Sequence, residues 1–109
     1  MNDERLANLR TQVGGARDGA LLRYSLGNAL LDAGEAAEAA LQLRTAIRFD
    51  PEYSAAWKLL GKAQLALGDK DAAAEAWREG IGVAERRGDV QAAKEMRVFL
   101  KRLDVRGET

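Results

Sequence analysis

Cysteine and histidine are both absent from this sequence of 109 residues. Their absence excludes disulfides, thiolate nucleophiles, imidazole acid–base catalysis and zinc sites with Cys or His ligands. The sequence also lacks a glycine-rich phosphate loop and a nucleophile elbow. Its carboxylates lie near the starts or on the outer faces of predicted helices, where they stabilise helix ends. We therefore predict that the protein is not an enzyme and needs no metal or cofactor.

Proline, aromatic residues and β-branched residues are few. There is one proline, Pro51, and there are two residues each of Phe, Trp and Tyr. The shortage of β-branched residues argues against a β-sheet, whereas 47% apolar content is enough for a buried core. We expect one all-α domain over residues 1–109.

An excess of charge of one sign is missing as well. The 17 basic and 17 acidic residues balance, which removes the long-range field that would attract the whole protein to nucleic acid or an anionic membrane. The charged start, Met1 to Arg5, is followed by no apolar run of signal-peptide length, and no stretch approaches the roughly 20 apolar residues of a membrane span. We expect a cytoplasmic protein with no membrane partner.

The sequence matches itself when it is shifted by 34 residues. The period indicates a stack of helix-turn-helix units, because small residues recur where neighbouring helices must approach closely. The matching pairs are Leu26/Leu60, Gly27/Gly61, Ala29/Ala63, Leu31/Leu65, Gly34/Gly68, Ala39/Ala73, Arg44/Arg78 and Ile47/Ile81.

Glycine and proline mark the ends of the predicted helices. They predict an N-terminal helix over 3–14, a first helical hairpin over 20–53, a second over 54–87 and a final helix over 89–104. Asp18 and Asp89 precede predicted helices and are expected to cap them. Because Glu85 stands one period after Pro51, we expect the second hairpin to end in a longer helix and to be the last regular one. The breaks fall at Gly14-Gly15, Gly34, Asp50-Pro51, Gly68 and Gly88.

The two flanking helices are predicted to close the ends of the stack. Each hairpin has an apolar face that only a neighbour can cover, so a stack of two needs a cap on either side. The final helix carries its apolar residues on one arc and Lys94, Arg97 and Lys101 on the other. The first helix, with Leu6, Leu9 and Val13, is a shorter cap. The apolar arc consists of Ala92, Ala93, Met96, Phe99, Leu100 and Leu103.

These hairpins resemble the tetratricopeptide repeat, whose pattern is W-x2-L-G-x2-Y, then A-x3-F, then P. The resemblance covers residues from about 20 to 85 and implies a short α-solenoid of two TPR-like hairpins. The second copy matches at Trp57, Leu60, Gly61, Gly68, Ala73 and Trp77. The first copy matches at Leu26, Gly27, Gly34, Ala39, Leu43, Ala46 and Pro51. The pattern is broken at Arg23, Leu30, Gln64, Gly80 and Glu85.

The resemblance implies a binding groove on the concave side, lined by the first helix of each hairpin. We name seven expected groove residues the concave stripe. Lys58 and Lys62 lie one turn apart and could hold a carboxylate or an acidic segment, while Asn28 could bind a peptide backbone and Tyr24 offers a flat contact. The simpler interpretation is that both lysines are solvated. The concave stripe comprises Leu21, Tyr24, Asn28, Leu31, Lys58, Lys62 and Leu65, and Ala55 is expected beside it.

The resulting hypothesis is a non-catalytic adaptor that binds a protein or peptide segment, acidic and with an apolar anchor. A chaperone-type carboxylate clamp is not expected, because Tyr24 and Leu59 stand where that clamp has Lys and Asn. Two alternatives stay open: self-association through an apolar end of the stack, and binding of RNA or another polyanion by the basic final helix. Trp57 and Trp77 are expected in the core rather than as stacking platforms for bases.

Overall fold

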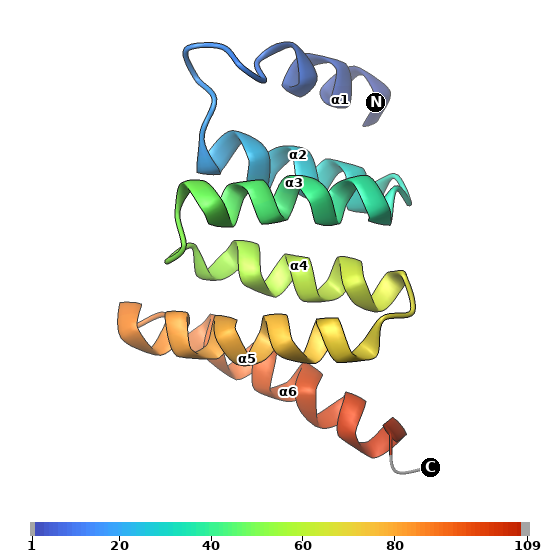
Figure 1. The fold of residues 1–109 in the computed structure, drawn as a ribbon, viewed down its shortest axis with the longest axis vertical. Helices are drawn as coiled ribbons and strands as arrows, with labels where there is room; N and C mark the ends of the chain where they lie inside the picture. Colours follow the sequence, from blue (N-terminus) through green and yellow to red (C-terminus); the bar gives the residue numbers. More distant parts are fainter. Residues whose placement is uncertain (1, 108–109) are drawn as a thin grey trace.

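Helices alone make up the regular structure of the described chain. The computed structural model describes residues 2–107, with side chains over 3–103. The helices stack one below another along the long axis (Figure 1), so the predicted all-α solenoid is confirmed. In chain order they are α1 (Asn2–Thr11), α2 (Ala20–Asp32), α3 (Ala36–Phe49), α4 (Ser54–Ala66), α5 (Lys70–Arg87) and α6 (Val90–Gly107).

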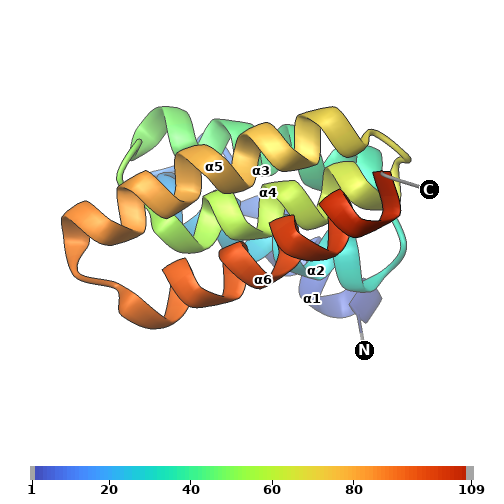
Figure 2. The ribbon, with the colours of Figure 1, turned by 90° about the horizontal axis from the view of Figure 1, so that it is seen from below.

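The stack is built from consecutive antiparallel pairs. The pairs α2 with α3 and α4 with α5 form the two hairpins, and α6 packs on α5 as α4 packs on α3. Helix α4 also contacts both α2 and α6, whereas α3 and α5 do not contact each other in the described part of the chain. Seen along the stack, α3 and α5 lie on one side and α6 on the other (Figure 2). Because α4 contacts both α2 and α6 whereas α3 and α5 do not meet within the described residues, we call the side of α2, α4 and α6 the concave side.

The turns after α2 and α4 have the same construction. Gly34 and Gly68 adopt the left-handed backbone conformation, with φ of 81° and 82°. The following N–H groups, of Glu35 and Asp69, donate to carbonyls five residues earlier at 2.8 and 3.0 Å. This Schellman arrangement satisfies carbonyls that the helix leaves without partners. Identical turns give both hairpins the same geometry.

The start of α2 differs from the prediction. Gly19 occupies the N-cap position and offers no side-chain cap, so the prediction that Asp18 caps this helix is wrong. The Asp18 carboxylate instead accepts hydrogen bonds from the Arg23 guanidinium at 2.8 Å and from the Gly14 N–H at 2.9 Å. The Arg23 hydrogen bond is the main reason that the pKa of Asp18 lies far below its usual range. Arg23, which forms this ion pair, thus occupies the position at which the repeat pattern has tryptophan.

The later helices begin as predicted. The carboxylate of Asp69 accepts from the Ala72 N–H at 3.1 Å at the start of α5. The carboxylate of Asp89 accepts from the Ala92 N–H at 3.2 Å at the start of α6, which confirms the expected cap. Both are N-cap contacts that satisfy a free N–H of the first helical turn.

Three helical glycines let the helices approach closely. A Cβ on Gly27 would lie 2.6 Å from the Leu43 Cγ, and a Cβ on Gly61 would overlap the Trp77 indole. Both contacts confirm the close approach predicted from the period. At Gly80 a Cβ would meet the Met96 Sδ at 2.5 Å. The same Cβ would lie 2.8 Å from the Trp57 Cβ in α4, so both α4 and α6 require glycine rather than alanine at this position of α5.

The core has two parts, and α6 closes the second. One cluster lies among α1, α2, α3 and α4 and includes Ala76 of α5, with Leu26, Leu30 and Leu43 fully buried. The other joins α5 and α6, with Trp77 and Met96 fully buried. The predicted apolar arc of the final helix therefore faces inward.

Two glycine-to-alanine substitutions should have opposite effects on stability. Gly61→Ala places a methyl group into the Trp77 indole, and overpacking of this kind costs about 1 to 3 kcal/mol of unfolding free energy. Gly82→Ala in α5 places a methyl group whose nearest neighbour is the Arg86 Nη1 at 3.6 Å. This substitution should raise the unfolding free energy by up to about 1 kcal/mol, because alanine has a higher helix propensity than glycine. Urea unfolding of both variants checks this, and equal shifts of the midpoints would contradict the packing described.

Candidate binding face

The α2 residues of the concave stripe differ in exposure and in what their side chains pack against. Leu21 is the most exposed large apolar residue among those described, at 70%. The Tyr24 ring stacks on the Tyr53 ring with centroids 5.0 Å apart, which fixes its orientation. Asn28 and Leu31 are half-buried, and Leu31 packs against the first core cluster. Tyr24 and Asn28 thus keep accessible surface, whereas Leu31 is partly used by the core.

The α4 part of the concave stripe makes contacts that the sequence did not predict. The Lys58 ammonium lies 2.6 Å from a Glu95 carboxylate oxygen in α6. The Lys62 ammonium lies over the Phe99 ring, 5.2 Å from its centroid, at a distance typical of a cation–π contact. Both residues that meet these lysines come from α6. Lys58 is therefore already neutralised within the chain, and its interpretation as a simply solvated lysine is wrong.

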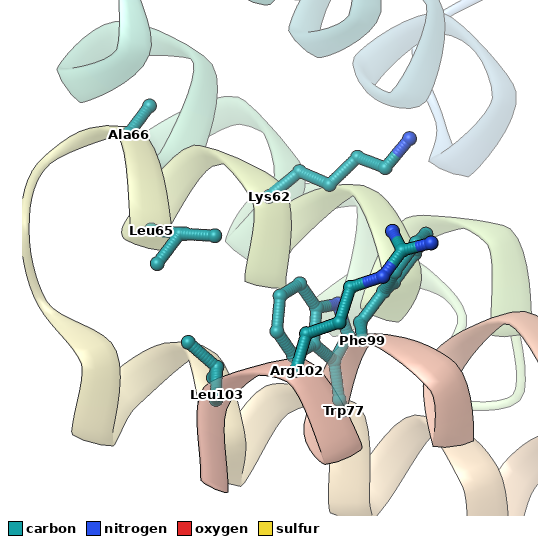
Figure 3. A pocket seen from close by; sticks show the side chains of 7 residues that line it. All are labelled: Lys62, Leu65, Ala66, Trp77, Phe99, Arg102 and Leu103. Atoms are coloured by element: carbon teal, nitrogen blue, oxygen red, sulfur yellow. The ribbon is translucent and has the colours of Figure 1, made fainter. Parts of the chain in front are cut away.

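A hollow of about 480 Å³ lies between α4 and α6, and we call it the α4/α6 hollow (Figure 3). Lys62 and Arg102 extend towards the same end of it, while Leu65 and Leu103 lie at the opposite end. The Trp77 indole forms its base. The residues lining it are Lys62, Leu65, Ala66, Trp77, Phe99, Arg102 and Leu103.

Sequence reasoning placed Lys62 and Leu65 in a groove but missed Phe99, Arg102 and Leu103. The final helix was predicted to cap the stack, with polyanion binding as an alternative, and not to line a groove, although α6 lies beside α4 as α4 lies beside α2. One signal could have identified the pairing. Glu95 and Phe99 are four residues apart, and so are Lys58 and Lys62, so two neighbouring helices could present these pairs to each other.

Hydrogen bonds to two carboxylates attach the first half of α6 to α4. The Ser54 hydroxyl donates to Asp89 at 2.8 Å, and this bond is the main cause that lowers the pKa of Asp89. The Lys58 ammonium is the main cause that lowers the pKa of Glu95, and the Gln91 amide adds to it. Both carboxylates are thus more acidic in the folded protein than in the unfolded chain.

The charges of the last two helices are partly paired. Arg97 forms an ion pair with Glu85, and Arg86 forms another with Glu52 at 2.8 Å. Among the described residues, no group of three or more carboxylates is placed to hold a metal ion. No helix of the described chain has the length and apolarity needed to cross a membrane.

Comparison with known proteins identifies the family. A TPR repeat family model matches residues 27–68. The TPR repeat-containing protein PA0015 of Pseudomonas aeruginosa is 54% identical over 87 residues, which cover 80% of this chain and 83% of that protein. The chain belongs to the TPR repeat family. The resemblance seen in the sequence is therefore confirmed, and TPR repeats generally mediate protein interactions.

Solved structures agree with the TPR architecture. The solution structure of protein BPP2914 from Bordetella parapertussis superimposes with a TM-score of 0.82 at 40% identity, covering 93% of this chain and 88% of that one. The crystal structure of MamA superimposes with a TM-score of 0.72 at 22% identity, covering 98% and 69%. At that identity the likeness to MamA concerns the fold alone. Both agree with a stack that includes α6.

Acid should weaken the attachment of α6 to α4. The folded-state pKa values of Glu95 and Asp89 are lowered, so their stabilising contribution is complete above the ordinary carboxyl pKa of about 4 and is lost as the pH falls through the folded-state values. We expect the unfolding free energy to fall below about pH 4, and less steeply in Glu95→Gln. Urea titrations between pH 2 and 7 measure this. Glu75→Gln, at an exposed α5 position, is the control, and an equal change of slope in both variants would contradict the assignment.

Proposed function

We propose that the protein is a non-catalytic adaptor that binds a protein segment along the concave side of α2, α4 and α6. The observation that carries this proposal is the α4/α6 hollow, which extends the concave stripe onto a third helix. Its volume falls in the range of about 300 to 1,000 Å³ that is typical of ligand sites. Concave surfaces of this kind are how helical-repeat proteins present extended binding area.

The stripe residues have different proposed roles. Tyr24 is a rigid aromatic anchor, because its ring is supported by Tyr53. Asn28 offers an amide to a peptide backbone. Lys62 attracts an acidic group, and Leu65 contributes apolar contact inside the hollow. Lys58 acts through Glu95 and positions α6 rather than the ligand.

The stripe has seven proposed members in all. We propose direct contact for six of them and a positioning role for the seventh, Lys58. The six are Leu21, Tyr24, Asn28, Leu31, Lys62 and Leu65.

Polyanion binding by α6 is the less favoured alternative. Arg97 is paired with Glu85, and Arg102 lines the α4/α6 hollow. Because Arg97 and Glu85 cancel locally, the positive field of this helix is weaker than its number of basic residues suggests. The proposed partner is therefore a protein segment.

Peptides selected from a random display library on the full chain provide the test. We expect their affinity to fall about tenfold or more in Tyr24→Ala/Asn28→Ala, since anchors at the centre of a binding face carry most of the energy. The matched control is Leu41→Ala/Arg44→Ala, which removes exposed side chains of α3 on the other side of the stack. Circular dichroism verifies that both variants fold. Equal losses in the two variants, or losses in the control alone, would contradict binding on the concave side.

A further inference from the structure

Helix α6 already binds α4 through a carboxylate and an aromatic ring that lie four residues apart. Glu95 meets the Lys58 ammonium at 2.6 Å, and Phe99 lies 5.2 Å from the Lys62 ammonium. Side chains four residues apart share one face of a helix, with Cβ atoms about 5 to 6 Å apart. The chain itself therefore shows which helical pattern this face of α4 accepts: an acidic residue followed, four residues later, by a large apolar one.

The α4/α6 hollow presents the same chemistry one turn further along α4. Its two charged lining residues, Lys62 and Arg102, are cations, and no acidic residue is among its described lining residues. No salt bridge to either cation occurs among the described side chains. Leu65 and Leu103 form an apolar end opposite the two cations (Figure 3). The hollow is thus complementary to a carboxylate next to an apolar side chain.

We propose that the α4/α6 hollow binds an acidic amphipathic helix of a protein partner, with a carboxylate at position i and a large apolar residue at i+4. The carboxylate meets Lys62 and Arg102, and the apolar side chain lies between Leu65 and Leu103. This inference rests on the proposed adaptor function and names its ligand class. A helix is favoured over an extended segment because adjacent side chains of an extended chain point to opposite faces, and its same-face neighbours are roughly 6.6 Å apart.

The spacing between the carboxylate and the apolar side chain distinguishes a helical ligand from an extended C-terminal segment. In an extended C-terminal segment, the free carboxylate and the apolar side chain belong to one residue and need no helix. Binding of a helical probe therefore depends on the spacing of two residues, whereas binding of a C-terminal probe does not. This spacing can be varied without changing the composition of the peptide. The lining cations can be reversed without touching the core, because Lys62 and Arg102 are exposed.

The experiment titrates the full chain with blocked, alanine-based helical peptides carrying a fluorophore. The probe has Glu at i and Leu at i+4. Its matched control has the same composition with Glu and Leu two residues apart, on opposite faces. We expect the probe to bind about tenfold more tightly than the control. Lys62→Glu/Arg102→Glu should lose this preference and instead prefer a probe with Lys at i. Lys101→Glu, an exposed charge on α6 outside the hollow, should change nothing.

Several results would overturn the proposal. These are equal binding of probe and control, a charge-reversed variant that still prefers the Glu probe, and a non-helical peptide with a C-terminal Leu carboxylate that competes as well as the helical probe. If display-selected peptides depend on Tyr24 and Asn28 but not on Lys62 and Arg102, the adaptor function stands and this inference fails. If they depend on neither pair, both fail.

Discussion

The architecture depends on the contact between Gly61 and the Trp77 indole. Because residue 61 has no Cβ, the indole lies directly against the backbone of α4, and its Nε1–H donates to the Lys58 carbonyl at 3.0 Å. A helical carbonyl has a second lone pair, so it can accept this bond besides its own. The indole in turn contacts the Phe99 ring, with centroids 5.1 Å apart. One missing side chain thus determines the distances among α4, α5 and α6.

That contact also connects packing with the candidate site. Trp77 forms the base of the α4/α6 hollow, and Phe99 supports the Lys62 ammonium beside it. Helix α6 therefore has two roles: it covers the apolar end of the second hairpin, and it supplies half of the hollow. A capping helix that only shielded the core would not need Glu95 and Phe99 at a spacing that matches two lysines of α4.

The sequence predicted the periodic features and missed those that depend on the meeting of distant segments. The period of 34 residues and the glycines at helix ends predicted the hairpins, because these properties are local or repeat exactly. The interaction of Lys58 with Glu95 was missed, since it depends on how α5 positions α6. Asp18 was wrongly expected to cap α2, because Arg23 competes for its carboxylate. The reason for Gly80 likewise lies in other helices, at Trp57 and Met96.

Hydrogen exchange of the two indole N–H groups, followed by NMR, tests the central contact most directly. The Trp77 indole is buried and bonded to the Lys58 carbonyl, whereas the Trp57 indole donates to the Pro51 carbonyl at an exposed position, at 2.9 Å. We predict that the Trp77 indole proton exchanges only through global unfolding, while that of Trp57 exchanges much faster. Equally fast exchange of both indole protons would contradict the close packing of Trp77 on Gly61.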